Sequence, residues 1–197
     1  MKSDVIVVQS NGKGREEALC QTEAVAVFKG LNKQNTIHLR LLAEEMIGML
    51  NAMVGEVQAE YWLQDADQIY ELHLKAKTRL DPDKRENLLS VSSSGRNAAA
   101  KGIMGKIRDI FTQALEARSL AGGVYDAGYY YEDSGMIHMG MINPAGSWSL
   151  NQYRSNLPKS REEEWDELEK SIIANLADEV EIFIQGGYVE LVIYKKF

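Results

Sequence analysis

Histidine and cysteine, with three residues and one residue, are the rarest side chains here that could ligate a metal or act as nucleophiles. His38, His73 and His138 are far apart, with no cysteine or carboxylate at ligand spacing, so a structural metal site is not expected. Cys20 stands in an apolar stretch, and we expect it to be a small buried side chain without a chemical role. The sequence has no G-x-S-x-G, the nucleophile elbow that a Ser-His-Asp hydrolase would show.

Glycines and lysines near position 100 come nearest to a phosphate-binding loop. In the stretch SSSGRNAAAKGIMGKIRDI, Gly102 and Gly105 would let backbone N–H groups approach a phosphate, and Lys101 and Lys106 supply positive charge. The spacing is not that of a P-loop, which needs G-x-x-x-x-G-K-[ST] after a strand. Small residues in a tightly packed helix explain the same pattern.

Aromatic residues gather in a second region of interest, residues 124–158. It contains Tyr129, Tyr130, Tyr131, Trp148 and Tyr153. Tyrosine and tryptophan bury a large area at low entropic cost, so these side chains could form a recognition surface for a partner. They could equally pack this segment onto the rest of the domain.

Composition narrows the class of protein. The chain has 197 residues, of which 45% are hydrophobic, which is enough for one domain with a substantial core. The net charge of −7 argues against nucleic acid as a partner. No apolar run reaches the length of about 18 residues that a membrane span needs, and the first residues lack the apolar core of a signal peptide. We therefore expect a soluble cytoplasmic protein.

The first half of the chain predicts a strand, two helices and a hairpin. The strand covers residues 4–9, the first helix residues 16–29 with Gly30 as its stop, and the second helix residues 36–54. The second helix carries an apolar stripe at period 3.6, formed by Leu39, Leu42, Met46, Leu50 and Met53. Residues 59–80 alternate as two strands joined at Asp65-Ala66-Asp67, which indicates a sheet with one solvated face.

The second half is less regular until its end. Asp81-Pro82 predicts a short helix over residues 83–89, and a Ser/Gly connector leads to a long helix over residues 98–118. Residues 124–158 form an irregular insertion with one strand near residues 136–142. Ser160 and Glu163 form a capping box for a helix to about residue 177. A hairpin over residues 180–194 follows, turning at Gly186-Gly187.

This order of elements resembles the ATPase-domain fold shared by gyrase, histidine kinases and anti-sigma-factor serine kinases, and most closely the last. The opening DVIVVQSNGKGREEAL is similar to their first strand and helix. The stretch HLRLLAEEMIGMLNAMVGE occupies the place of their nucleotide-binding helix, whose signature is Glu-x-x-x-Asn. The ending SIIANLADEVEIFIQGGYVELVIYKKF is similar to their last helix and closing strands.

The resemblance implies ATP as the ligand and a role for each motif position. Glu45 matches the general base, but Met49 stands where the family has the magnesium-binding Asn, and a thioether is a poor ligand for magnesium. Aligning on Asn51 instead puts Ile47 at the acid. Helix geometry favours Glu45, which lies at the edge of the apolar stripe; the alternative is an ordinary exposed glutamate.

The remaining family positions fall on the middle of the chain. Asp81 or Asp83 matches the aspartate that reads adenine, although both also suit the first turn of a helix. Gly102 and Gly105 resemble the second glycine box, with Lys106 beside them.

We therefore predict an α+β fold, a two-layer sandwich of a mostly antiparallel sheet with helices on one face, in a single domain over residues 1–197. The predicted function is regulatory: a protein that resembles anti-sigma-factor kinases, with eroded magnesium-ATP motifs, acting through a protein partner or a second copy of itself. The insertion at 124–158 is the expected contact surface. The alternatives are an active ATP-dependent serine/threonine protein kinase with Glu45 as base, and a binding module for another small molecule.

Overall fold

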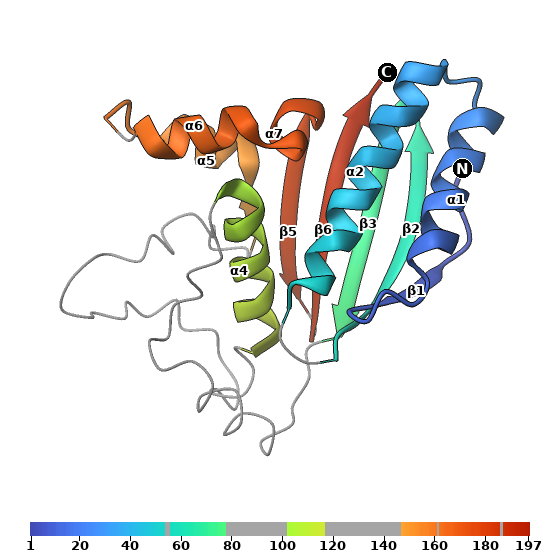
Figure 1. Cartoon of the computed structure of the whole chain (residues 1–197), viewed down its shortest axis with the longest axis horizontal. Helices are drawn as coiled ribbons and strands as arrows, with labels where there is room; N and C mark the ends of the chain where they lie inside the picture. Colours follow the sequence, from blue (N-terminus) through green and yellow to red (C-terminus); the bar gives the residue numbers. More distant parts are fainter. Residues whose placement is uncertain (54–55, 78–101, 117–146, 161, 186) are drawn as a thin grey trace.

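The computed structural model describes residues 1–53, 56–77, 102–116, 147–160, 162–185 and 187–197. Within these ranges a six-stranded sheet forms one layer and the helices form the other, all on the same face of the sheet (Figure 1). The predicted α+β class with an antiparallel sheet is therefore confirmed. The strands are β1 (Ile6–Gln9), β2 (Gln58–Ala66), β3 (Ile69–Lys77), β4 (Ser147–Ser149), β5 (Glu179–Gln185) and β6 (Tyr188–Lys196), and the helices are α1 (Arg15–Phe28), α2 (Lys33–Asn51), α4 (Gly102–Glu116), α5 (Leu150–Asn156), α6 (Glu162–Lys170) and α7 (Ile172–Leu176).

The strand order is β1-β2-β3-β6-β5-β4, and every neighbouring pair is antiparallel. The C-terminal hairpin was predicted correctly, and Gly187 in its turn has a φ of +88°. Strand β6 lies between β3 and β5, so the hairpin joins the two halves of the chain in one sheet.

Helices α1 and α2 follow the predicted pattern. Gly30, with φ +74°, follows the end of α1, and the predicted stripe on α2 is buried, with Leu39, Leu42 and Met46 fully enclosed. Helix α2 begins three residues earlier than expected because the side chain of Asn32 caps it, accepting a hydrogen bond from the Asn35 N–H.

The turn between β2 and β3 lies later than predicted. Ala66 pairs with Ile69, which leaves Asp67 and Gln68 as a two-residue turn with φ values of +51° and +67°. Positive φ at both positions is the geometry of the tight hairpin turns. Neither position is a glycine, so the sequence carries no glycine signal for this turn.

The last part of the insertion predicted over residues 124–158 has regular secondary structure. Residues 147–156 form β4 and α5, and the side chains of Trp148 and Tyr153 are only 3% and 7% exposed. The reading of these two aromatics as a recognition surface is wrong, because both belong to the core. Tyr129, Tyr130, Tyr131 and the strand predicted near residues 136–142 lie outside the described residues, as does the short helix predicted over residues 83–89.

The long last helix is in fact two helices. The chain leaves the helical path at Ser171, whose hydroxyl caps α7 by accepting from the Ala174 N–H. Helix α4 falls inside the range predicted for it. Cys20 is exposed rather than buried, so that prediction is wrong. Among the helices of the described ranges, none is long and apolar enough to cross a bilayer.

Candidate functional site

Helix α2 presents two flanks beside its core stripe, and ion pairs identify the flank that faces α1. Arg40 contacts Glu23 of α1 at 2.9 Å, and Glu44 contacts Arg15 at the start of α1 at 2.7 Å. Successive residues of a helix are about 100° apart, so Glu45 projects from the opposite flank. That flank faces the side on which α4 and α7 contact α2.

Glu45 is half-buried there, and it has no hydrogen bond or ion pair with any residue in the described ranges. Its neighbour Glu44 is engaged by Arg15. A partly buried carboxylate without a partner contributes nothing evident to folding, since charges leave water at a cost unless they are paired. Glu45 is therefore the acidic side chain of α2 that remains available to a ligand.

The other residues that the two alignments of α2 invoke differ in their exposure. Met49, one turn after Glu45, is only 4% exposed and belongs to the core. Ile47, the acid position of the other alignment, is 1% exposed. Asn51 is exposed. Helix α2 thus carries a carboxylate at Glu45 but no oxygen ligand one turn later, where Met49 is buried.

Helix α4 carries two of the residues predicted to bind phosphate. Gly102 is its first residue, and Gly105 lies in the next turn and is buried. Lys106 is already engaged: its Nζ lies 3.0 Å from Oε2 of Glu164, donates a hydrogen bond to the Tyr153 hydroxyl and sits 4.5 Å from the centre of that ring. A phosphate would have to compete with these contacts.

Arg108 lies on the other flank of α4 and was not found from the sequence. It is two residues from Lys106, about 200° around the helix, and hence points away from α6. Helix α4 contacts α2 on one side and α6 on the other. Nε and Nη2 of Arg108 are buried, and within the described ranges they have no hydrogen-bond partner. Burial raises the pKa of the adjacent Asp109, although the positive charge of Arg108 acts to lower it.

Glu45 is therefore on the flank of α2 away from α1, and Arg108 is on the flank of α4 away from α6, and neither forms an ion pair in the part of the chain that is described. We call these two residues the α2–α4 site. A half-buried guanidinium with two unpartnered nitrogens favours the binding of an anion, because carboxylate and phosphate oxygens match its fork of donors. Asp81 and Asp83 lie outside the described residues, so their role in reading adenine stays a prediction, as do the roles of Gly102, Gly105 and Lys106.

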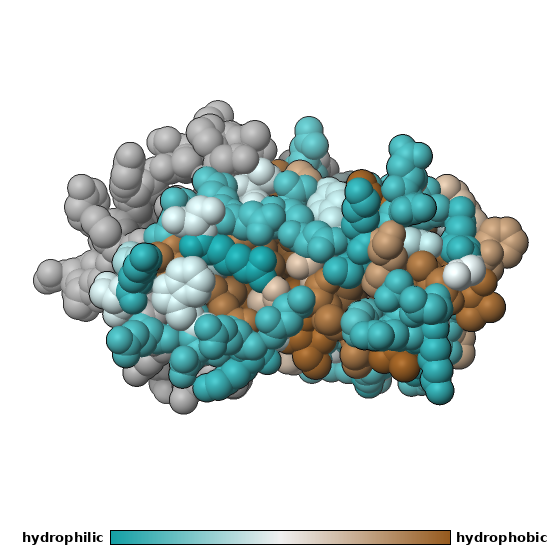
Figure 2. Space-filling model, turned by 90° about the horizontal axis from the view of Figure 1, so that it is seen from above, coloured by the Kyte–Doolittle hydropathy of each residue, from teal (hydrophilic) through white to brown (hydrophobic). Residues whose placement is uncertain are grey.

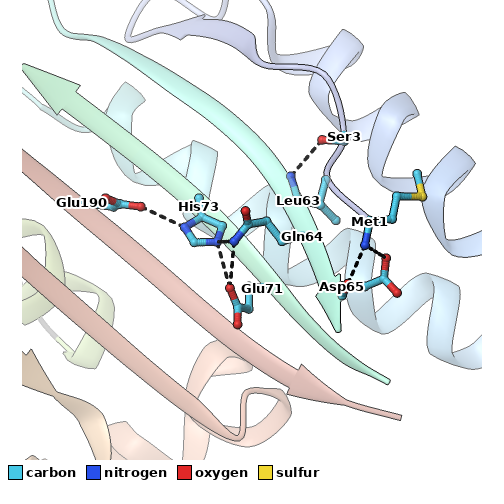
Figure 3. Close-up of polar contacts among 8 residues, drawn as sticks. All are labelled: Met1, Ser3, Leu63, Gln64, Asp65, Glu71, His73 and Glu190. Atoms are coloured by element: carbon cyan, nitrogen blue, oxygen red, sulfur yellow. Dashed lines mark hydrogen bonds and ion pairs between the residues drawn. The ribbon is translucent and has the colours of Figure 1, made fainter. Parts of the chain in front are cut away.

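A second polar cluster lies on the sheet face that has no helices. His73 donates or accepts at both ring nitrogens, with Glu190 Oε1 2.9 Å from Nδ1 and Glu71 Oε2 3.2 Å from Nε2 (Figure 3). Gln64 reaches both His73 and Glu71 at 3.1 Å. Every polar atom of the imidazole is thus engaged by protein, which is the pattern of a structural histidine. In the ranges that the structure covers, no group of His, Cys, Asp and Glu could hold a metal ion.

No protein-family model, curated protein or solved structure matches this chain. The features of the chain that bear on function are therefore the order of its elements and the α2–α4 site.

Proposed function

We propose that this protein is a regulator with a histidine-kinase-like ATPase fold, which binds an adenine nucleotide at the α2–α4 site and acts by binding a partner protein. The chain begins with a strand, two helices and a hairpin and ends with a helix and a hairpin, with α4, β4, α5 and α6 between these two parts. This beginning and ending support the fold assignment, as does a sheet with helices on one face. Both were expected from the resemblance to anti-sigma-factor kinases.

The observation that carries the proposal is the pair formed by Glu45 and Met49. Glu45 stands at the general-base position with a carboxylate that no described residue engages. Met49 stands at the position of the magnesium ligand with its side chain in the core. A hard cation needs oxygen ligands, so a nucleotide at this site would bind with little help from magnesium.

Arg108 supplies the positive charge that such a site needs. The triphosphate of a nucleotide carries several negative charges, and without a metal these require protein cations. A guanidinium binds two phosphate oxygens at once, and the buried nitrogens of Arg108 have no competing partner in the described ranges. We expect Arg108 to contact phosphate and Lys106 to keep its contact with Glu164.

Calorimetric titration with ATP and ADP tests the site. Arg108→Gln should weaken binding about tenfold or more, the loss of ~1.4 kcal/mol that a charged hydrogen bond supplies. Lys106→Gln is the comparison on the opposite flank of α4 and should change affinity less. Equal affinity of wild type and Arg108→Gln for nucleotide would mean that the nucleotide binds elsewhere on the protein. No heat of binding in the wild type would mean that the protein does not bind nucleotide.

One observation favours a second candidate, an active serine/threonine protein kinase. The free carboxylate of Glu45 is the group that a general base requires, since a base must be able to accept a proton from the attacking hydroxyl. Release of ADP from ATP in the presence of a protein substrate distinguishes the two. If the protein is a regulator, release of ADP should not exceed background. If it is a kinase, ADP should be released by the wild type and by Glu44→Gln but not by Glu45→Gln.

A further inference from the structure

His73 lies on the helix-free face of the sheet with polar groups at both ring nitrogens. Glu190 Oε1 is 2.9 Å from Nδ1, and Glu71 Oε2 is 3.2 Å from Nε2 (Figure 3). The side-chain nitrogen of Gln64 is 3.1 Å from Nε2 and 3.1 Å from the same oxygen of Glu71. Since protein groups engage both nitrogens, the ligand that the ring can still take is a proton.

Two hydrogen-bond patterns fit these positions. A neutral imidazole has one donor and one acceptor, whereas a protonated imidazole has two donors. With the single proton on Nδ1, the ring donates to Glu190, and Nε2 accepts from one N–H of Gln64 while the other N–H reaches Glu71. With both nitrogens protonated, Nε2 donates to Glu71 and Gln64 loses its acceptor on the ring. The same heavy-atom positions therefore accommodate two protonation states.

The imidazole is the group of this cluster that changes charge near neutral pH. The other charged and titratable side chains around it come from each neighbouring strand and from the segment before β1: Glu60 on β2, Lys75 on β3, Tyr194 on β6, Glu181 on β5, and Lys2. Carboxyl, ammonium and phenol groups ordinarily titrate outside the range of about pH 5 to 8, in which imidazole changes its charge. The hydrogen bond with His73 lowers the pKa of Glu190, so this carboxylate stays ionised over the same range.

Burial makes the charge of this ring consequential. Figure 2, which views the molecule from the end at which β2 and β6 terminate, shows hydrophilic side chains, in teal, over much of the described surface. His73 and Trp62 differ from that surface because each is only 7% exposed. Water screens a buried charge poorly, so a proton on His73 must be balanced by the side chains that contact it.

Lys2 is the neighbour that a proton on His73 would disturb. The imidazole is stacked on the ring of Trp62, with centroids 4.7 Å apart, and the Lys2 ammonium lies 4.6 Å from the same ring centre. Because the imidazole covers one face of the indole, the ammonium lies over the other. A protonated His73 would put a second positive charge against this ring and would neutralise carboxylate charge that attracts Lys2. The backbone of Lys2 pairs with that of Gln64.

We propose that His73 is a proton-controlled switch between two arrangements of this face. In the first, the neutral ring carries its proton on Nδ1, donates to Glu190 and accepts from Gln64, and Lys2 stays over Trp62. In the second, the protonated ring donates to both carboxylates, Gln64 loses its bond to the ring, and the contact of Lys2 with Trp62 is weakened. The switch lies on the other face of the sheet from the α2–α4 site and does not depend on nucleotide binding.

Nuclear magnetic resonance of the imidazole nitrogens tests the two states, because it reports the proton on each nitrogen separately. At about pH 8 only Nδ1 of His73 should carry a proton, and at about pH 5 both nitrogens should. Gln64→Met removes the N–H group that faces Nε2 and should move the proton of the neutral ring to Nε2, where Glu71 accepts it. Glu60→Met is the matched control on the same strand and the same face, and should leave the proton on Nδ1. A neutral wild-type ring protonated at Nε2, or a ring that keeps one state over the whole range, would overturn the switch.

The backbone amide signals of Lys2 and Ser3 test the coupling. In the wild type they should shift between about pH 8 and pH 5 with the same midpoint as the His73 ring. In His73→Gln, which has no ring to titrate, the shift should disappear, and circular dichroism confirms that this variant is folded. If it does not fold, the agreement of the midpoints in the wild type decides. Signals that stay constant in the wild type, or that shift equally in His73→Gln, would overturn the coupling to Lys2.

Discussion

The indole ring of Trp62 lies flat against the imidazole of His73, with ring centroids 4.7 Å apart and planes 6° from parallel. The two residues are cross-strand partners on β2 and β3, on the sheet face without helices. Both residues are 7% exposed, although alternation predicted a solvated position for His73. The two rings are also contacted by charged side chains. Glu71 and Glu190 contact the imidazole, and the ammonium of Lys2 lies 4.6 Å from the centre of the Trp62 ring. This face therefore carries a small core of its own.

Removing His73 should destabilise the fold. His73→Ala takes away the stacked ring and a hydrogen-bonding partner of Glu190 and Glu71, and we expect the free energy of unfolding to fall by about 2 kcal/mol. Urea denaturation measures it. Lys77→Ala, at the exposed end of the same strand, is the control and should change stability by less than about 0.5 kcal/mol. Equal stability of the two variants would mean that the cluster is only a surface arrangement.

The same cluster should make stability depend on pH. The hydrogen bond from His73 is the main cause that holds the pKa of Glu190 below its ordinary value of 4.5, with the positive charges of Lys75 and Lys2 acting in the same direction. A carboxyl whose pKa is lower in the folded state stabilises the fold fully above its unfolded pKa and loses that contribution as the pH falls through the folded value. Stability should therefore decline on acidification below about pH 4.5. Glu190→Gln should flatten this part of the pH profile, and an unchanged slope would contradict the assignment.

Gly14 is the glycine whose replacement should be costly. It has φ +79°, and a Cβ on it would overlap the backbone carbonyl of Val7. Gly14→Ala must therefore shift β1 away from the start of α1, and we expect a loss of more than about 2 kcal/mol in unfolding free energy. Gly12→Ala separates the two effects, because Gly12 has φ +90° but nothing within 4 Å of its Cβ position. Gly12→Ala should lower the unfolding free energy by only about 1 kcal/mol, the cost of a left-handed backbone conformation for alanine. Equal losses for the two variants would show that the contact with Val7 is unimportant.

Trp148 should behave as a core residue. Trp148→Ala leaves a cavity beside Tyr153, whose ring centre is 6.2 Å away, and is expected to cost about 3–5 kcal/mol. Tyr188→Ala is the control, since Tyr188 is an aromatic strand residue that is 40% exposed. If Trp148→Ala unfolds like the wild type but loses association with a partner, the residue serves recognition after all.

The sequence predicted the elements whose signals are local and repeated. The apolar stripe from Leu39 to Met53 spans about four helical turns, and the C-terminal hairpin alternates over both strands, so each pattern could be recognised without knowing which elements lie next to it. Strand β4 has three residues and α5 has seven, too short for any period to appear, and Trp148 was consequently assigned to an irregular segment. The break at Ser171 depends on one hydroxyl cap within a sequence that otherwise suits a helix.

The parts of the site that could not be predicted are those that depend on neighbouring elements. Glu45 was identified from the resemblance and from helix geometry, but only the ion pairs of Arg40 and Glu44 show that its flank faces away from α1. Arg108 gave no signal, because a charged residue in a helix is usually solvated and the side of α4 that meets α2 is set by packing. Cys20 was assigned to the core because α1 is apolar on both sides, and periodicity does not tell which side is buried.

The dependence of ATP affinity on magnesium tests the central claim most directly. Met49 is buried in the core one turn after Glu45. It therefore offers no oxygen ligand for magnesium at the α2–α4 site. Calorimetric titration of the wild type with ATP, in magnesium and in chelator, should give dissociation constants that agree within about threefold. Glu45→Gln should bind at least as tightly as Glu44→Gln, because it removes a negative charge from the site. Tightening of tenfold or more by magnesium, about 1.4 kcal/mol, would contradict the account and point to an active magnesium-dependent kinase.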